Sequence, residues 1–468
     1  MNILMVTIGY PPEQIGGTEI YVAGLVDVLQ ERGHACAIAY VDEFVDESGP
    51  PHRVRHRSHN GTDVFAMEVN RVHYSPEFLV FDGKLRELLV LELLAVVARL
   101  RPDVVHIHPL RLGLESYLVE ALTRASYPVV LTFHSSTTTC ARGDLVFMGR
   151  EVCDGQIRQH RCTACLMHSR GVPAPAARLL SAAPPGFYRR AHTALAAAPT
   201  LRKLRSFASL PLLVEEQSHA FARTGANVRA LVAVCDWVKE TAIRNGAPAE
   251  KVVSSRHGLR LAPEHLQLGH LGVTRFGYLG RIGPEKGIGV LLDALEQLPE
   301  ECRFEFEFCS ASFGRSALPR PERLLRERIL AAARRDGRIR IVGAVDDDAL
   351  SPTLARWDAI VVPSLWLESG PQVVYEAFAV ATPVIGSRRG GIAELVRDGK
   401  TGFLFTPNDA AELTCLLERF AEDPSPLRAM RSAIPPVRTT EDVADDMESL
   451  YARVTGRLQT SAPQRSAN

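Results

Sequence analysis

The chain has 468 residues, 46% hydrophobic and 23% charged, which is the composition of an ordinary globular protein with two or three domains. Its 54 basic and 54 acidic side chains cancel at pH 7, which argues against a nucleic-acid partner. Nine cysteines, an odd number in so long a chain, do not suggest a disulfide framework.

The N-terminal residues predict a first β-strand rather than a signal peptide. Residues 1–8 lack a basic segment, and Pro11 and Pro12 follow at once. The apolar run at 88–100 is interrupted by charged residues and fits a packed helix better than a membrane span. We therefore expect a cytoplasmic protein.

The first elements predict a βαβ unit, with strands at 2–8 and 35–40 and a helix at 18–32. No G-x-G-x-x-G lies between the first strand and the helix, so the dinucleotide fingerprint is absent. Gly16 and Gly17 at the start of the helix would let backbone N–H groups approach a phosphate or a sugar closely. A plain helix-capping pair is the alternative.

Two further predicted strands, 101–108 and 129–134, end in histidines. His106 and His108 are two residues apart and therefore share one face of their strand. His134 stands at the carboxyl end of the next strand, where ligands gather in open α/β sheets. It could bond a sugar hydroxyl or shuttle a proton, and a purely structural role is the alternative.

Four cysteines fall in one predicted loop after this strand, and two of them have the C-x2-C spacing that lets both thiolates bind one tetrahedral ion. On this spacing we predict a zinc ion. Its role would be structural, because four protein ligands leave no open position for catalysis. Reduced thiols, a redox disulfide and an iron–sulfur cluster are the alternatives, with His160 and His168 as substitute ligands. The four cysteines are Cys140, Cys153, Cys162 and Cys165.

Residues 155–214 contain nine Arg or Lys and no Asp or Glu. They belong to an insertion expected at about 140–226 in an N-terminal domain that spans 1–262. This basic segment could lie against an anionic bilayer at the inner face of the membrane or bind an acidic acceptor. A solvated helical insertion rich in alanine and arginine is the alternative.

A linker is expected at 263–273, followed by a second βα series at 274–438. Its first strand, 275–279, leads into Arg281 and Lys286. Arginine as a planar fork and lysine as a point charge could neutralise a diphosphate, and a surface ion pair is the alternative.

The most informative stretch is a strand at 359–362 followed by a helix at 371–379. Glu368 lies in the loop at the mouth of this helix, and Glu376 lies inside it, with seven residues between them. The first-turn N–H groups offer an anion site, because they have no partner within the helix. The two carboxylates could accept hydrogen bonds from two polyols, such as a sugar and a ribose.

This E-x7-E pair resembles the donor-binding part of the retaining glycosyltransferases of family 4, as do the predicted Gly390-Gly391 turn that leads to Glu394 and the segment 398–405. The resemblance implies an α/β protein of the GT-B fold, with two Rossmann-like domains facing each other across a cleft. It implies transfer of a sugar from a nucleoside diphosphate sugar, most readily a UDP- or GDP-sugar, to an acceptor hydroxyl with retention. No catalytic metal is expected, and the four-cysteine cluster resembles that of some family members.

The resemblance also assigns individual residues. The reacting donor would contact Glu368 and His134 through its sugar, and Arg281 and Lys286 through the leaving diphosphate. The remaining donor-binding residues would be Gly16, Gly17, Gly370 and Glu376, the last on the ribose.

The last helix, expected at 439–458, would cross back to the first domain, and residues 459–468 are expected to be disordered. The acceptor is expected to be a glycan, a lipid-linked molecule or a small molecule. A nucleotide-sugar hydrolase or epimerase on the same scaffold is an alternative function. A non-catalytic, zinc-containing adaptor is a further alternative.

Overall fold

The computed structural model describes residues 1–13, 16–73, 83–108, 110, 114–134, 138–149, 151–196, 198–260 and 272–457. The chain forms two compact units: unit 1 comprises Met1–Arg256 and Thr440–Asn468, and unit 2 comprises His257–Thr439. The first unit thus ends six residues before the boundary expected at residue 262. Most of the expected linker 263–273 and all of the tail 459–468 lie outside the described residues.

Unit 1 is built on an eight-stranded sheet in the order β10-β9-β6-β5-β1-β2-β4-β3. Its strands are parallel, except that β3 runs antiparallel to β4 at one edge. The hairpin of β3 and β4 is not among the predicted elements; β3 is largely exposed and basic, and so lacks an apolar face. The strands are β1 (Asn2–Thr7), β2 (Ala35–Phe44), β3 (His52–His59), β4 (Thr62–Asn70), β5 (Val104–Ile107), β6 (Val129–Phe133), β9 (Ala230–Ala233) and β10 (Val252–Ser254).

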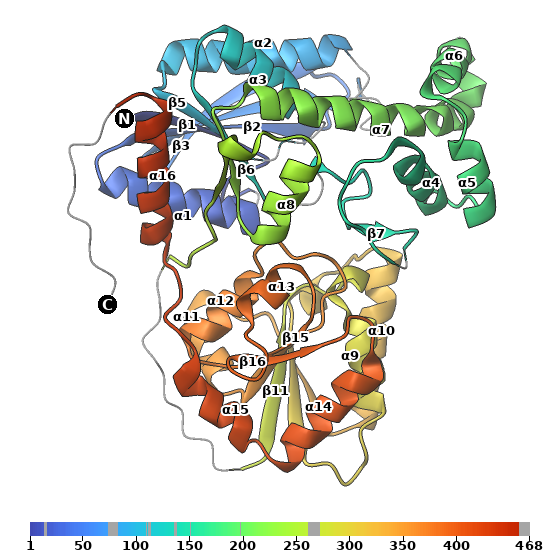
Figure 1. The fold of residues 1–468 in the computed structure, drawn as a ribbon, viewed down its shortest axis with the longest axis vertical. Helices are drawn as coiled ribbons and strands as arrows, with labels where there is room; N and C mark the ends of the chain where they lie inside the picture. The colour runs from blue at the N-terminus through green and yellow to red at the C-terminus, as the bar shows by residue number, and fades with distance from the viewer. Residues whose placement is uncertain are drawn as a thin grey trace. The chain divides into compact units, whose positions relative to one another are not determined.

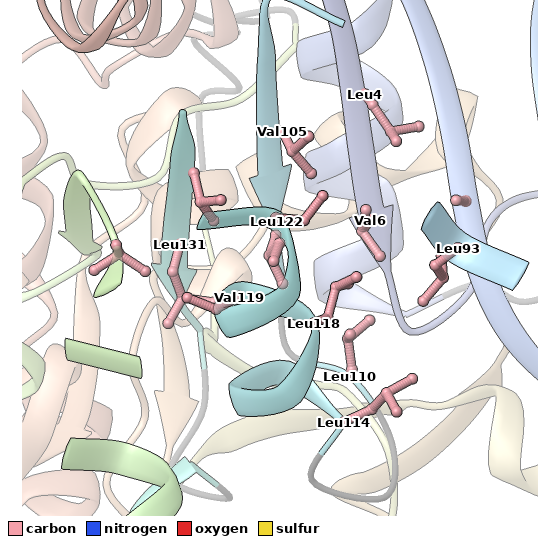
Figure 2. Packing of buried hydrophobic residues seen from close by; sticks show 14 of the residues in the cluster. Leu4, Val6, Leu93, Val105, Leu110, Leu114, Leu118, Val119, Leu122 and Leu131 are labelled. Carbon is pink, nitrogen blue, oxygen red and sulfur yellow. The ribbon is translucent and has the colours of Figure 1, made fainter. Parts of the chain in front are cut away.

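Helices cover both faces of this sheet, and alternate residues of β1 show how. Leu4 and Val6 point into a cluster with α2 (Gly83–Leu100) and α3 (Glu115–Arg124), as Figure 2 shows. Ile3 and Met5 point to the opposite face, against α1 (Gly17–Glu31) and α16 (Thr440–Val454). Each fully buried side chain of this kind stabilises the fold by about 1.5–3 kcal/mol.

The last helix, α16, packs in unit 1 although it follows unit 2 in the chain (Figure 1). Arg32 on α1 donates hydrogen bonds of 2.7 Å to both Asp445 and Glu448. The Tyr451 hydroxyl lies 2.6 Å from Nδ1 of the buried His106. A core contact and two ion pairs therefore hold this helix on the first unit.

Between β6 and β9 the chain forms a small helical region with its own core of Met167, Tyr188, Leu210 and Val214. The basic segment 155–214 is thus helical, as the solvated-insertion alternative expects. The elements are β7 (Val146–Phe147), β8 (Glu151–Val152), α4 (Gln159–Ser169), α5 (Ala174–Ser181), α6 (Pro185–Leu195), η3 (Pro199–Leu201) and α7 (Arg202–Asn227). A short helix, α8 (Asp236–Arg244), follows β9, and η4 (Ala249–Lys251) precedes β10.

Unit 2 contains a six-stranded parallel sheet in the order β13-β12-β11-β14-β15-β16. The strands are β11 (Thr274–Leu279), β12 (Phe304–Cys309), β13 (Ile339–Gly343), β14 (Ala359–Val362), β15 (Val384–Ser387) and β16 (Gly402–Phe405). The helices are α9 (Ile288–Glu296), α10 (Arg320–Arg335), α11 (Asp347–Ala355), α12 (Gln372–Ala379), α13 (Gly390–Leu395), α14 (Ala410–Glu422) and α15 (Ser425–Met430), with short turns η5 (Pro284–Lys286), η6 (Ala311–Gly314) and η7 (Arg431–Ala433).

Both sheets have the winding of Rossmann-like α/β domains, in which parallel strands alternate with helices. Such sheets place the ends of several strands together at one edge, so loops far apart in the sequence can meet there. Among the described helices, none combines the length and the apolar character needed to cross a bilayer.

Candidate functional site

The loops that follow β11 and β14 meet at the carboxyl edge of the sheet in unit 2. Gly287 has a φ of +72°, and a Cβ at this position would lie 1.9 Å from the carbonyl oxygen of Pro363. The Leu365 N–H donates to the Glu285 carbonyl at 2.8 Å. Only glycine permits this approach, so the two loops pack backbone against backbone.

Lys286 and Glu368, one from each loop, form the centre of this edge. Nζ of Lys286 lies 2.7 Å from Oε1 of Glu368, and the Ser364 hydroxyl donates to the same oxygen at 2.9 Å. The side chains of Lys286 and Glu368 are only 22% and 11% exposed, so solvent screens the pair weakly. The lysine ammonium also lies 5.0 Å from the ring centroid of Trp366. The structure thus brings together two of the predicted site residues.

The Gly390-Gly391 pair packs on the backbone of Glu368. The Gly391 N–H donates to the Glu368 carbonyl at 2.6 Å, and a Cβ at Gly390 or Gly391 would lie 2.9 or 2.8 Å from that oxygen. The sequence predicted a glycine turn here, but the two glycines are the first residues of helix α13. The two glycines therefore support the loop that carries Glu368 and do not reverse the direction of the chain.

Gly370 makes room for a buried histidine at the start of α12. A Cβ at Gly370 would lie 2.0 Å from Nδ1 of His257, which is only 6% exposed. Burial lowers the pKa of His257 to about 4. His257 belongs to unit 2, whereas the sequence placed it within the N-terminal domain expected at 1–262. Because nothing local links it to Gly370, sequence reasoning missed this contact.

Glu376 lies within α12, as expected, and its side chain is partly exposed. Burial, and to a smaller extent the negative charge of Asp347 at the start of α11, raise its pKa to about 7. A carboxyl group that titrates near neutral pH beside the ends of parallel strands is a functional-site candidate.

Arg281 is the most accessible of the predicted phosphate-binding residues. Its side chain is 66% exposed, and its nearest acidic group, on Glu285, lies 3.6 Å away. The Tyr278 hydroxyl donates to its backbone carbonyl at 2.6 Å. The backbone is therefore held while the guanidinium reaches into solvent.

The loops after β12 and β13 are tied to the loop that carries Arg281. The Ile282 N–H donates to the Ser312 hydroxyl at 3.3 Å, and the Ser310 N–H donates to the Gly343 carbonyl at 2.6 Å. Arg389, which the sequence did not single out, donates to the Leu365 carbonyl. Burial lowers the pKa of Arg389.

In unit 1, Gly16 caps the N-terminus of α1 after β1, and its carbonyl accepts from the Ile20 N–H at 3.0 Å. Apart from its chain neighbours and the backbone of α1, no described residue comes within 4 Å of the Cβ position of Gly17. Both glycines thus stand at the helix start, where the sequence placed them, and Gly17 faces open space.

His134 follows β6 directly, but it is buried in a histidine network. Its Nε2 lies 2.8 Å from Nδ1 of His108, and its ring centroid lies 4.8 Å from that of Tyr21. His106 continues the network through the Thr132 hydroxyl at 2.7 Å. Burial lowers the pKa of His106 to about 3, so this imidazole is neutral at physiological pH.

The sequence suggested that the four cysteines share one loop, but the structure places them in different elements. Cys162 and Cys165 lie on α4, while Cys140 precedes and Cys153 follows the β7–β8 hairpin. All four line one cavity of about 20 Å³. The prediction failed because the C-x2-C spacing also fits one turn of a helix.

Backbone N–H groups point at two of these sulfurs. Arg158 donates to Sγ of Cys162 at 3.3 Å, and Met148 donates to Sγ of Cys165 at 3.2 Å. Burial raises the pKa of the Cys162 thiol to about 11. Within the described residues, no group of three or more His, Cys, Asp or Glu is arranged to hold a metal ion. The donor set has the chemistry that zinc prefers, but the thiols are not gathered into a coordination sphere.

The suggested substitute ligands are engaged elsewhere. Nδ1 of His160 lies 2.6 Å from the Ser181 carbonyl, and Nδ1 of His168 lies 2.8 Å from the Val172 carbonyl. Each histidine therefore uses one ring nitrogen on the backbone of its own helical region.

Comparisons with known proteins match both units. The family model described as Glycosyltransferase Family 4 matches residues 15–203, and that described as Glycosyl transferases group 1 matches residues 270–435. The amylovoran biosynthesis glycosyltransferase AmsK of Erwinia amylovora is 26% identical over 223 residues, 45% of this chain and 52% of its own. The chain thus spans about half the length of this curated relative.

Two other similarities extend over nearly the whole chain. The glycogen synthase of Mycobacterium tuberculosis is 26% identical over 434 residues, 91% of this chain and 87% of its own. The crystal structure of Anabaena Alr3699/HepE in complex with UDP-glucose has a TM-score of 0.57 and 16% identity, over 98% of this chain and 100% of the other. The chain therefore carries a glycosyltransferase family 4 domain and a glycosyl transferases group 1 domain, joined in the GT-B fold of two Rossmann-like α/β domains.

Proposed function

We propose that the protein is a retaining glycosyltransferase that moves a sugar from a nucleoside diphosphate sugar to an acceptor hydroxyl. The observation that carries the proposal is the weakly exposed Lys286–Glu368 pair between two glycine-closed loops. It lies in the unit that matches the group 1 glycosyltransferase model. The pair therefore stands at the carboxyl edge of the sheet, where ligands of such folds bind.

Arg281 and Lys286 act on the leaving group in this proposal. The exposed guanidinium of Arg281 binds one phosphate as a fork, and Lys286 supplies a point charge. The acceptor oxygen attacks the anomeric carbon on the face from which the diphosphate departs, and its proton passes to the departing phosphate oxygen. Fixed positive charge stabilises the negative charge that develops on this group.

Glu368 orients the donor sugar, and Glu376 accepts hydrogen bonds from the ribose in its ionised form. Its partly exposed carboxyl with a pKa of about 7 supports that role, because a large fraction of the group is ionised at neutral pH and can accept hydrogen bonds from a ligand. We assign His134 to another sugar hydroxyl and Gly16 and Gly17 to the donor phosphates, on the strength of their places at a strand end and a helix start.

For the donor we propose a UDP-sugar first and a GDP-sugar second. The similar fold of the Anabaena protein, whose structure holds UDP-glucose, supports this order. We propose action at the cytoplasmic face of a membrane or in the cytoplasm. Phe187, 61% exposed, and Leu204, 56% exposed, lie in the basic segment and support a peripheral contact with anionic lipid.

We also propose that the four cysteines bind one structural zinc ion that draws their sulfurs together. Their shared cavity and the N–H bonds to two of the sulfurs support this assignment. Elemental analysis of the purified full chain should find about one zinc per molecule, and Cys162→Ser should lower that content. Zinc content unchanged by Cys162→Ser, or absent from the wild type, would contradict the assignment.

The function is tested by thermal stabilisation with UDP-, GDP-, ADP- and dTDP-sugars. A ligand that binds only the folded state raises its stability, so one nucleotide should stand out. Arg281→Ala and Glu376→Ala should each abolish that shift. Arg323→Ala, which removes another exposed arginine of unit 2, should leave it intact.

Product analysis then separates transfer from the alternatives on the same scaffold. A disaccharide or glycoside product supports transfer, whereas free sugar or an isomerised donor would indicate a hydrolase or an epimerase. Metal binding without any nucleotide response would favour the adaptor.

A further inference from the structure

Unit 1 contains a cavity of about 570 Å³ that the donor-site assignment leaves unused. Ile8 follows β1, Leu110 follows β5 and Phe133 ends β6, and all three line it. These strands are neighbours in the sheet, and the strand order reverses between β1 and β5. The cavity therefore lies at the carboxyl edge beside the topological switch point, the usual place for a ligand in such sheets.

One face of α7 forms a second wall of the cavity. Leu213, Gln217, Ala220 and Thr224 all line it, and their spacing of four, three and four residues places them on one side of the helix. This helix packs beside α3 (Figure 1). The first turn of α3 also lines the cavity, through Glu115, Ser116 and Tyr117. The cavity thus lies against two helices, and a larger side chain on either helix can fill it.

The cysteine region forms the remaining wall. Cys140, Ala141, Arg142 and Leu166 line both this cavity and the small cavity shared by the four thiols. Any change that loosens the cysteines therefore moves a wall of the larger cavity.

Most of the lining surface is apolar, although charged side chains also reach the cavity at Arg86, Glu115, Arg142, Arg170 and Glu216. Glu115 already accepts a hydrogen bond of 2.9 Å from the Leu110 N–H. Ser116 is 1% exposed, and its hydroxyl has no hydrogen-bond partner in the described part of the chain. The Tyr117 hydroxyl already donates to Glu216 at 2.7 Å, and Arg142 already donates to Asp144 at 2.7 Å. The aliphatic and aromatic lining residues are Ile8, Leu110, Leu131, Phe133, Ala141, Leu166, Leu213, Ala220 and Phe221.

This chemistry disfavours a bare sugar as the occupant. A monosaccharide carries hydroxyls on all sides, and those pressed against leucine and phenylalanine would lose their hydrogen bonds to water without replacement. A cavity of about 570 Å³ suits a compact ring system, and one unpartnered hydroxyl can fix its orientation.

We infer that this cavity binds the acceptor, and that the acceptor is a small molecule with a compact aromatic or alicyclic body that carries the reacting hydroxyl. The inference rests on the proposed glycosyltransferase function and narrows its three acceptor classes to one. The apolar body fills the space between α7 and the strand ends, and the Ser116 hydroxyl pairs with a polar substituent.

The test is isothermal titration calorimetry of the full chain with three glucosides that share one sugar. They are 4-methylumbelliferyl α-glucoside with a compact ring body, methyl α-glucoside without a body, and octyl α-glucoside with a chain, each below its micelle concentration; the α configuration is the one that retention from UDP-glucose gives. We expect the ring glucoside to bind about tenfold or more tightly than either of the others. Equal or tighter binding of the methyl or octyl compound would overturn the inference.

Variants on α7 locate the binding. Ala220→Trp and Leu213→Trp fill the cavity from two turns of the helix and should each weaken ring-glucoside binding about tenfold or more. Ala222→Trp adds the same side chain at an exposed position of the same helix and should bind like the wild type. Two cavity-filling variants are used so that the test remains decisive if one of them fails to fold. Binding of the ring glucoside as tight as that of the wild type, in a filling variant that folds, would overturn the inference.

The same variants are also titrated with the nucleotide sugar that stabilises the wild type. A retained nucleotide response with lost ring-glucoside binding supports both proposals. A nucleotide response without selective ring-glucoside binding overturns the cavity assignment alone. Ring-glucoside binding without any nucleotide response overturns the proposed function, and with it the acceptor role.

Discussion

The carboxyl edges of the two sheets have similar backbones but opposite chemistry. In unit 2 the edge is charged, with Lys286 against Glu368 and Arg281 reaching into solvent. In unit 1 the corresponding edge holds the buried imidazoles of His108 and His134 and an apolar cavity walled by Phe133. Topology sets where a ligand binds in each unit, and the side chains set which class of ligand it is.

The comparison assigns an anionic donor to unit 2 and an apolar acceptor body to unit 1. A charge change in unit 2 should therefore affect nucleotide binding alone, and a volume change in unit 1 should affect acceptor binding alone. Four experiments can break or sharpen this division of labour.

The largest effect is expected from Lys286→Met. It removes the ammonium that pairs with Glu368 and is proposed to hold the diphosphate. A hydrogen bond to a charged group contributes about 1.5–3 kcal/mol, so nucleotide-sugar affinity should fall by about 10- to 100-fold in a titration. Lys400→Met, at an exposed turn of unit 2, is the control. Equal loss of ring-glucoside binding would break the division between the units.

Gly370→Ala should destabilise unit 2. Its Cβ would lie 2.0 Å from the His257 ring, and forced overpacking costs about 1–3 kcal/mol. Denaturant titration should show a lower free energy of unfolding together with weaker nucleotide binding. Gly289→Ala is the matched control, because its Cβ position in α9 has no described residue within 4 Å other than its chain neighbours and the helix backbone. A free energy of unfolding of Gly370→Ala equal to that of the wild type would mean that the loop carrying Glu368 tolerates displacement of His257.

Nucleotide binding should depend on pH through Glu376. The free carboxyl has a pKa of about 7, and the ribose is proposed to bind the ionised form, so affinity falls as the pH drops below 7. Protonation of the free protein should weaken binding about tenfold between pH 8 and pH 6. A nucleotide sugar is a suitable probe because its diphosphate diester does not titrate in this range.

Glu376→Gln should flatten that profile and should also change stability. Because burial raises the pKa from 4.5 to about 7, the buried carboxylate destabilises the folded state increasingly as the pH rises through this window. The variant should therefore gain stability relative to the wild type at pH 8 but not at pH 4. An unchanged slope of affinity against pH in the variant would remove Glu376 from the binding model.

The smallest effect is expected from Cys162→Ser. Loosening the thiol cluster shifts the wall that Cys140 shares with the larger cavity, so ring-glucoside affinity should fall about fivefold, which corresponds to about 1 kcal/mol. Nucleotide binding should not change. Cys415→Ser, at an exposed position of unit 2, should alter neither ligand. Unaltered ring-glucoside binding in Cys162→Ser would separate the cysteine cluster from the acceptor cavity.

The sequence by itself determined most of the helices and strands. It also placed Glu368 in the loop before a helix and Glu376 within that helix. Strands such as 359–362 and helices such as 440–454 have periodic apolar patterns that any packed domain must bury. Glu368 and Glu376 could be placed because a strand, a loop and a helix within twenty residues define their surroundings. Local spacing is what such patterns encode.

Only the tertiary structure decided which distant segments touch. His257 against Gly370, Cys140 beside the α4 cysteines, and α7 over the strand ends all join residues whose spacing carries no local signal. The exposed β3 strand escaped prediction for a related reason, since it pairs at an edge without an apolar face. Contacts of this kind depend on packing and loop closure across the whole chain, so they emerge only once the fold is formed.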